Sequence, residues 1–480
     1  MTSSPGLLAY LLIPLFTAIV IPFAGRLRPK LADIFANVTL LAGLINLSLV
    51  LFDPANVATS FANITEDGFA LLMIFVIYLV ALCVTFFSSY FIEEGSGINR
   101  APYFSLLMIS VSAMCGVVTT GDFFTLYIFI EVLAVSSFAL IASGERTRGL
   151  EGAIKYFLLT FPASVFILFG IAFLMLTAGT FSFEGVKVII ASGLPVGAVV
   201  FAVSLILLGF LIKSGVVPFH AWTPDAYEGA YSPVSAFLAG IVTKISGVYA
   251  VIKIAMMLRL FEIKAYHTAE ILMFLGMLSI AVGAIAALRQ KEFKRMLAFS
   301  SISQVGYIIL AAGMGTPLAI LGAIFHFVNH ATFKTVLYLN SASLERGAGT
   351  SDMTKLGGME HPMPWTSWTS IVALLSTAGV PPLSGFWSKL IIILALWDGG
   401  ARTYAVLALL FSVITLAYFV IMQKKIFFGK PTEASQNARE VRPAMLAPVV
   451  AVSLLIVALG VFFPYIYAYL LETVAARILL

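Results

Sequence analysis

The chain has 480 residues and a net charge of +5; 61% of its residues are hydrophobic and only 11% are charged, against roughly 25% in ordinary soluble domains. Apolar stretches of about 18 residues or more, long enough to cross a bilayer core of about 30 Å, recur throughout. These features exclude a soluble protein and a nucleic-acid binder, and they predict an all-α integral membrane protein.

Breaks between the apolar stretches predict about fourteen membrane helices. The first carries neither a basic leader nor a small-residue cleavage site, so we expect a span and not a signal peptide. The predicted helices cover 6–25, 31–52, 68–91, 103–120, 122–143, 153–178, 196–216, 232–259, 268–288, 296–314, 317–342, 366–397, 402–428 and 443–471. The corresponding segments are 1–102 (helices 1–3), 103–260 (helices 4–8), 261–428 (helices 9–13) and 429–480 (helix 14).

Two predicted helices, the seventh and the twelfth, are interrupted by proline. Pro218 follows the seventh, and Pro381 and Pro382 lie within the sequence TAGVPPLSG of the twelfth. Proline removes a backbone donor and clashes with the preceding turn, and irregular backbone inside a membrane persists only where protein or water surrounds it. Because the two breaks lie five helices apart, we expect an inverted five-helix repeat, helices 4–8 and 9–13.

Lysine and arginine indicate the orientation in the membrane. Counted together with the adjoining helix ends, the loops after odd-numbered helices hold 17 of the 28 basic residues, and the loops after even-numbered helices hold four. Basic residues favour the cytoplasmic side. We therefore expect a multi-pass protein of the inner (cytoplasmic) membrane with both termini on the outer face.

Several ionisable residues lie within the predicted spans, where each costs roughly 2.5–3.5 kcal/mol on insertion scales. Glu131 is nine residues past Asp122, about 13.5 Å into its helix and too deep for a short side chain to reach water. Lys213 lies five residues before Pro218, and Lys244 is central in the eighth helix. Lys253 is nearer the end of that helix, where we expect its stem to extend to the interface.

The eleventh helix carries His326, His330 and Lys334 at intervals of four residues. Four residues turn a helix by 400°, so the three lie within about 80° on one face. The HxxxH pair has no neighbouring carboxylate or third ligand, which disfavours a metal site. A row of titratable groups favours a proton relay, and Lys389 follows the break of the twelfth helix.

Five segments together resemble the antiporter-like proteins shared by respiratory complex I, Mrp-type sodium/proton antiporters and membrane-bound hydrogenases. They are IFIEVLAVSSFAL, IKSGVVPFHAWTPDAYEGAYSPVSAFLAGIVTKISGVY, KEFKRMLAFSSISQVGY, FHFVNHATFKTVLYL and GVPPLSGFWSKL. The resemblance covers roughly residues 100–425. Two features narrow the resemblance: a lysine on helix twelve and a chain that ends soon after helix fourteen. In both, the sequence resembles the D-type component of Mrp antiporters and its hydrogenase and complex I relatives.

The resemblance implies a proton pathway along Glu131, Lys213, Lys244, His326 or His330 with Lys334, and then Lys389. It also implies that Glu131 pairs with Lys213, so that the carboxylate keeps the lysine charged when close and lets it release its proton when apart. Partner subunits would drive the chain or carry Na⁺. We expect antiporter-like and small hydrophobic subunits in a hetero-oligomeric complex, with a peripheral iron–sulfur redox module in the redox-driven types.

The sequence itself supplies no redox or hydrolytic centre. It has no GxxxxGK[ST], no GxGxxG after a strand and no CxxC, and Cys83 and Cys115 both lie in predicted spans. We therefore expect no cofactor and no metal in this chain. Two alternatives remain open: a stand-alone ion-coupled solute transporter, for which the buried lysines would bind an anionic solute, and a structural anchor for a redox module.

Overall fold

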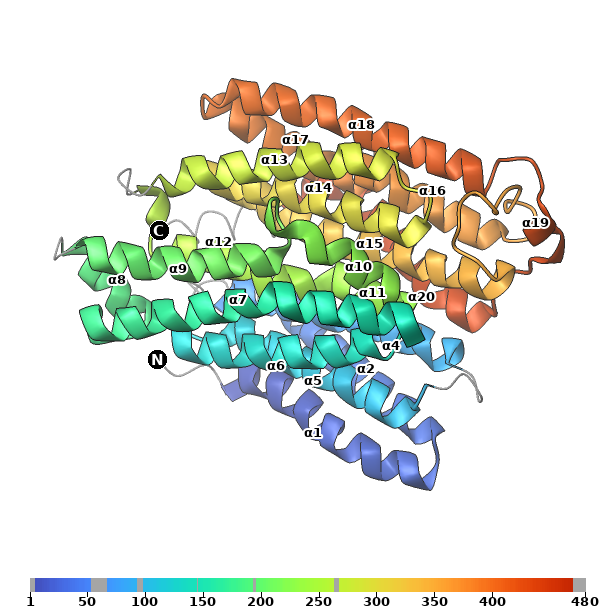
Figure 1. Cartoon of the computed structure of the whole chain (residues 1–480), viewed down its shortest axis with the longest axis horizontal. Helices are drawn as coiled ribbons and strands as arrows, with labels where there is room; N and C mark the ends of the chain where they lie inside the picture. Colours follow the sequence, from blue (N-terminus) through green and yellow to red (C-terminus); the bar gives the residue numbers. More distant parts are fainter. Residues whose placement is uncertain are drawn as a thin grey trace.

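The computed structural model describes residues 5–52, 67–92, 98–144, 146–192, 196–262 and 267–468. Over these ranges the chain is a bundle of helices without strands, apart from two isolated backbone bridges (Figure 1). The first half comprises α1 (Pro5–Leu27), α2 (Lys30–Phe52), α4 (Asp67–Phe91), α5 (Arg100–Thr119), α6 (Phe123–Ala142), α7 (Arg146–Ala178), α8 (Phe183–Ala191), α9 (Val196–Ser214), η1 (Phe219–Ala221), α10 (Trp222–Gly229), α11 (Ser232–Phe237), η2 (Leu238–Val242), η3 (Lys244–Tyr249) and α12 (Ala250–Met257). The second half comprises η4 (Leu260–Glu262), α13 (Thr268–Leu288), α14 (Phe293–Met314), α15 (Pro317–Ala348), α16 (Pro364–Ala378), α17 (Ser384–Asp398), α18 (Arg402–Ile426), α19 (Glu433–Asn437), α20 (Pro443–Val461) and α21 (Phe463–Ile466).

Twelve segments of the described chain are long and apolar enough to cross a membrane. They confirm a helical membrane protein. Two predicted spans, the eleventh and the twelfth, are absent from this set. The eleventh is α15, which has 32 residues and carries His326, His330 and Lys334 among its buried residues. The twelfth is divided into α16 and α17, each of only 15 residues.

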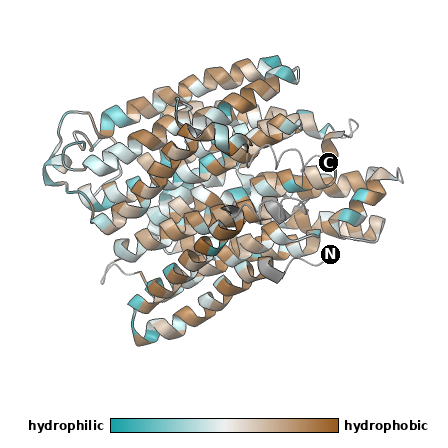
Figure 2. Ribbon diagram, turned by 180° about the vertical axis from the view of Figure 1, so that it is seen from behind, coloured by the Kyte–Doolittle hydropathy of each residue, from teal (hydrophilic) through white to brown (hydrophobic). Residues whose placement is uncertain are grey.

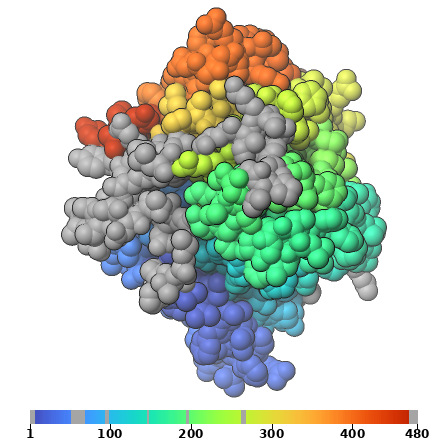
Figure 3. Space-filling view, turned by 90° about the vertical axis from the view of Figure 1, so that its left-hand side faces the viewer, coloured from blue at the N-terminus to red at the C-terminus, as the bar shows by residue number. Residues whose placement is uncertain are grey.

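Apolar side chains face outward and polar ones gather inside, the arrangement that lipid favours. Figure 2 shows largely hydrophobic helices on the outside, and Phe16 and Leu176 are 68% and 82% exposed. By contrast, residues 232–255 are all buried, and so is nearly all of α15 from Ala319 to Leu344. Seen end-on in Figure 3, the N-terminal helix and the segment near residue 400 lie at opposite edges, with the middle of the chain between them.

The chain leaves the helical conformation at both predicted breaks. α9 ends at Ser214 and is followed by Gly215 at φ 70°, and α16 ends at Ala378 and is followed by Gly379 at φ 84°. Glycine adopts this left-handed conformation without the steric cost of a Cβ, which makes it a common helix terminator. Pro218, and Pro381 with Pro382, come directly after these turns, and the chain then resumes as η1–α10 and as α17.

The structure adds two features that the sequence did not predict. The eighth predicted helix, 232–259, contains two π-helical segments, η2 and η3, and Lys244 is the first residue of η3. A short amphipathic helix, α8, follows α7 at the end of the bundle opposite α19 (Figure 1). π turns inside α-helices are rare and frequent at functional sites.

Candidate functional site

Glu131 and Lys213 form an ion pair within the membrane-spanning part of the bundle. The Lys213 Nζ lies 3.1 Å from the Glu131 Oε1, and Ser164 of α7 joins both side chains. Its Oγ donates to Glu131 at 2.6 Å and accepts from Lys213 at 3.0 Å. Glu131 stands nine residues beyond Asp122, whose side chain caps α6 by accepting from the Thr125 amide. The Lys213 side chain is 4% exposed, whereas that of Glu131 is 31% exposed.

Lys244 is fully buried, and within the described residues no carboxylate accepts a hydrogen bond from it. Its ammonium donates to the carbonyl oxygen of Ala239, one π turn earlier. Gly247, in the same π segment, packs on the end of α9, where an added Cβ would lie 2.4 Å from the Ser214 backbone. This close approach brings the helix of Lys244 against the helix of Lys213. Within the described residues, no direct hydrogen bond joins the two lysines.

The predicted face of α15 carries its three titratable residues into the interior, each with an exposure of 0%. His326 Nδ1 lies 2.9 Å from the Ser388 Oγ of α17. The Lys334 ammonium donates to Ser300 Oγ at 2.8 Å and to the Leu297 carbonyl at 3.1 Å. His330 lies between them on the helix, close enough for the charges of Lys244 and Lys334 to act on it.

Lys389 lies at the second helix break. Its ammonium donates to Ser412 Oγ at 3.2 Å and to the Ala378 carbonyl, the last of α16, at 3.4 Å. It also stands 4.7 Å above the ring of Tyr307. The terminal carbonyls of a helix carry partial negative charge, so the break itself supplies part of the environment of this lysine. Lys389 lies close enough to act electrostatically on His326.

The predicted residues thus lie on adjoining helices: the Glu131–Lys213 pair, then Lys244, then His330 with Lys334, then His326 with Lys389. The hydroxyl partners Ser164, Ser300, Ser388 and Ser412 were not predicted. A helical serine usually bonds its own backbone, so nothing in the sequence marks these four. Lys253 does not reach water as we expected: it is 7% exposed and donates to the carbonyls of Val118 and Thr120 at the C-terminal end of α5.

A cluster of surface charges, also not predicted, joins α7, α10 and α14 at one end of the bundle. Asp225 accepts from Lys155 at 2.8 Å and from Arg295 at 2.6 Å, and Arg295 also donates to Glu228 at 2.8 Å. These ion pairs connect α10, the helix that follows the break at Pro218, to α14 in the second half of the chain.

Asp352 and Glu292 pair across one of the backbone bridges and differ in their affinity for protons. Burial, with the nearby charge of Asp352, raises the pKa of Glu292 above its usual range. Hydrogen bonds from Thr354 lower the pKa of Asp352. Of the two carboxyl groups, Glu292 therefore takes up a proton first as the pH falls.

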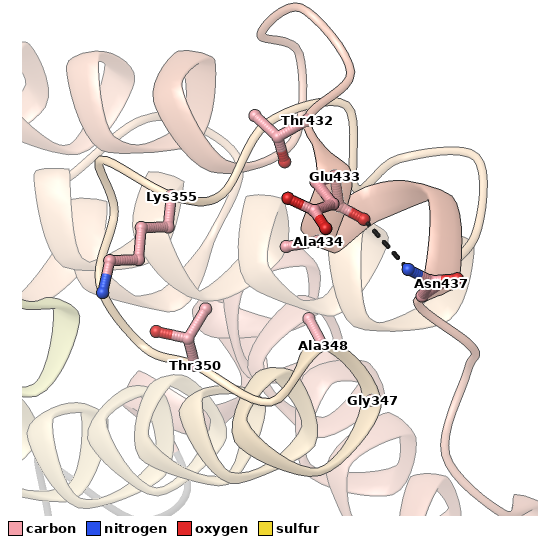
Figure 4. Close-up of a pocket in the computed structure, with 8 residues that line it drawn as sticks. All are labelled: Gly347, Ala348, Thr350, Lys355, Thr432, Glu433, Ala434 and Asn437. Atoms are coloured by element: carbon pink, nitrogen blue, oxygen red, sulfur yellow. Dashed lines mark hydrogen bonds between the residues drawn. The ribbon is translucent and has the colours of Figure 1, made fainter.

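A surface pocket of about 540 Å³ lies at the end of the bundle that carries α19 (Figure 4). Thr350 and Lys355 line one side, and Glu433 and Asn437 of α19 lie on the other. None of the buried charges of the candidate pathway lines this pocket. It is separate from the row of buried lysines and histidines.

Comparison with known proteins identifies the family. Residues 120–415 match the family model described as NADH:quinone oxidoreductase/Mrp antiporter, transmembrane. The chain is 30% identical to the D component of the Na(+)/H(+) antiporter of Alkalihalophilus pseudofirmus, over 87% of this chain and 83% of that one. It is also 30% identical to the N component of the NADH-quinone oxidoreductase of Desulforudis audaxviator, over 77% and 75% of the two chains.

Among solved structures, a chain of the membrane-bound sulfane sulfur reductase, an archaeal respiratory membrane complex, superposes with a TM-score of 0.88 at 25% identity. The alignment covers 99% of this chain and 98% of that chain. Family model, relatives and fold agree over the helices that carry the buried charges. The chain belongs to the NADH:quinone oxidoreductase/Mrp antiporter family of membrane proteins.

Proposed function

We propose that this chain is a proton-translocating, antiporter-like subunit of a multisubunit membrane complex. The proton pathway begins at Glu131 and Lys213 and continues to Lys244. From there it passes along α15 through His326, His330 and Lys334 and ends at Lys389. The observation that carries the proposal is that ionisable groups on adjoining helices are buried at membrane depth, where an isolated charge is expensive and marks an ion pathway.

The same contacts argue against a solute transporter. The ammonium groups of Lys244, Lys334 and Lys389 are each held by oxygens of this chain. A transporter for an anionic solute would instead direct them into a shared polar cavity. Protons need only groups that can bind and release them in sequence.

Partners follow from the relatives and from the energy source. The relatives include one component of an antiporter and one of a quinone oxidoreductase, and the structural match belongs to a respiratory complex. A hetero-oligomeric membrane complex therefore supplies the energy, through either an ion gradient or a redox reaction. We propose that this chain contributes no cofactor of its own and that any Na⁺ is moved through partners.

We further propose fourteen spans and an inverted repeat of helices 4–8 and 9–13. α15 and the pair α16–α17 complete the fourteen. Support for the repeat comes from the two breaks and the two backbone bridges: Asp122 with Ser182 and Glu292 with Asp352 each join the start of a repeat's second helix to the segment after its third. An even number of spans, with the basic loops in the cytoplasm, puts both termini outside.

Lys244→Ala in the assembled complex tests the function. The relay then has an apolar gap at its centre, so coupled proton movement in reconstituted vesicles is expected to stop while the complex still assembles. Lys187→Ala is the matched control, because Lys187 lies on α8, outside the proposed pathway, and pairs with Glu184 across 3.6 Å. Proton movement at the wild-type rate in the Lys244 variant would contradict the proposal.

A further inference from the structure

A group of buried polar side chains fills the space between α15, α16 and α18. Its members are Asn340, Thr366, Thr369, Ser370 and Gln423, all 5% exposed or less. Thr369 donates to the Asn340 Oδ1 at 3.1 Å, and Ser370 donates to the Gln423 Oε1 at 3.1 Å. None of them belongs to the pathway described above.

The two amide groups of this cluster are only half satisfied. The Asn340 Nδ2 and the Gln423 Nε2 are buried and have no hydrogen-bond partner within the described part of the chain, and neither does the neighbouring Ser341 Oγ. An unmade hydrogen bond on a buried polar group costs about 1–3 kcal/mol. Buried polar groups are almost always paired with protein or with ordered water. Water molecules within the cluster would satisfy these groups.

The inner end of the cluster approaches Lys334. The Ser300 Oγ, which accepts from the Lys334 ammonium, also accepts from the Tyr418 hydroxyl at 2.9 Å. Gln423 is five residues beyond Tyr418 on α18, about 7.5 Å along the axis and about 140° around it. A chain of hydrogen-bonded waters, at about 2.8 Å a step, would close the gap between the two side chains.

The outer end of the cluster reaches a carboxylate. The Thr366 hydroxyl donates to the Glu440 Oε1 at 2.7 Å, and the Glu440 Oε2 accepts from the Trp365 and Thr366 amides at the start of α16. Glu440 is partly exposed. The Arg439 amide beside it bonds the carbonyl of Gly347, which lines the surface pocket of Figure 4. The cluster thus reaches the solvated end of the bundle through Glu440.

We propose that Asn340, Thr366, Thr369, Ser370 and Gln423 hold a hydrated path that carries protons between Glu440 at the surface and Lys334. Glu440 takes up or delivers the proton at the solvent end, and hydroxyl groups and waters relay it inward. The inference rests on the proposed proton-translocating function. By the expected orientation this end of the bundle faces the cytoplasm.

The first test measures proton flux through the complex in vesicles. In the Asn340→Leu/Thr369→Val variant the polar groups of the path are removed at nearly constant volume, and the flux is expected to fall at least about tenfold, or ~1.4 kcal/mol in barrier. Glu440→Gln keeps an acceptor at the start of α16 but cannot bind a proton, and it is expected to slow the flux in the same direction.

The control is Thr160→Val on α7, a buried threonine whose hydroxyl donates to the Tyr156 carbonyl of its own helix. If Lys244→Ala stops transport but the Asn340→Leu/Thr369→Val variant transports protons at the wild-type rate, the path is wrong and the proposed function is still supported. Transport that continues in Lys244→Ala would instead refute the proposed function.

The second test does not depend on transport. With the buried Cys83 and Cys115 replaced by alanine, Asn340→Cys is exposed to a small cationic methanethiosulfonate added to one face of the membrane. Asn437→Cys, on exposed α19, identifies the face that bears Glu440.

Labelling of position 340 from that face is expected to be at least about tenfold faster than labelling of Ser343→Cys. Ser343 is equally buried on α15, but its hydroxyl bonds the Leu339 carbonyl. Equal labelling at both positions, or labelling of position 340 only from the opposite face, would overturn the path.

Discussion

Replacing Glu131 by glutamine removes the charge of the Glu131–Lys213 pair and nearly preserves its shape. Across the 3.1 Å that separates the two charged groups, the attraction is about 5 kcal/mol at an effective dielectric constant of about 20. A free-energy difference of 1.36 kcal/mol changes proton occupancy tenfold. Losing the carboxylate therefore shifts the protonation equilibrium of Lys213 by nearly four orders of magnitude. A step that depends on this lysine alternately holding and releasing a proton is expected nearly to stop.

Aspartate at the same position separates charge from shape. Its stem is shorter by one carbon, about 1.5 Å, and at a separation of about 4.5 Å the attraction is still about 4 kcal/mol. Glu131→Asp is therefore expected to retain part of the transport that Glu131→Gln loses. Glu184→Gln is the control, since Glu184 is an exposed carboxylate of α8 paired with Lys187.

Proton flux in vesicles containing the assembled complex distinguishes these outcomes. The expected order is wild type and Glu184→Gln together, then Glu131→Asp, then Glu131→Gln close to the leak rate. If the glutamine variant transports protons as fast as the aspartate variant, the charge at position 131 does not control Lys213, and the electrostatic argument is wrong.

At the second break, Lys389→Glu is expected to keep partial transport because glutamate also exchanges a proton, whereas Lys389→Leu is expected to abolish it; equal fluxes would remove Lys389 from the pathway. Gly385→Ala is expected to lower the amount of assembled complex and its thermal stability, because a Cβ there would lie 1.9 Å from the Ser376 carbonyl oxygen. Gly197→Ala, where a Cβ meets nothing within 4 Å, is its control, and equal stability of the two variants would show that α16 and α17 can move apart.

Sequence reasoning predicted the breaks and the buried charges because both violate a strong rule. Proline cannot continue a helix, and an ionisable group cannot rest cheaply in lipid, so Pro218 and Lys244 stand out against apolar neighbours. The position of Lys389 beside its break followed from the same logic.

The partners of these charges were not predicted, for a physical reason. Ser164 and Ser412 act through contacts made by three helices at once, and a hydroxyl on a membrane helix looks the same whether it bonds a lysine or its own backbone. The π segment of Lys244 was missed as well, because its residues have ordinary helical composition. The burial of Lys253 was not predicted because carbonyl oxygens at the C-terminal end of α5, which no sequence pattern displays, replace water around its ammonium.

Glu131 has its side chain 31% exposed, although Lys213 beside it is buried. A carboxylate on the outer surface of a membrane bundle cannot rest against hydrocarbon, since each exposed charge there costs several kcal/mol. We expect the assembled complex to cover it with a polar or charged surface. A cation brought near Glu131 from that side would compete with Lys213 for the same carboxylate. The first site of the proposed pathway would then respond, through a single side chain, to the state of a neighbouring protein.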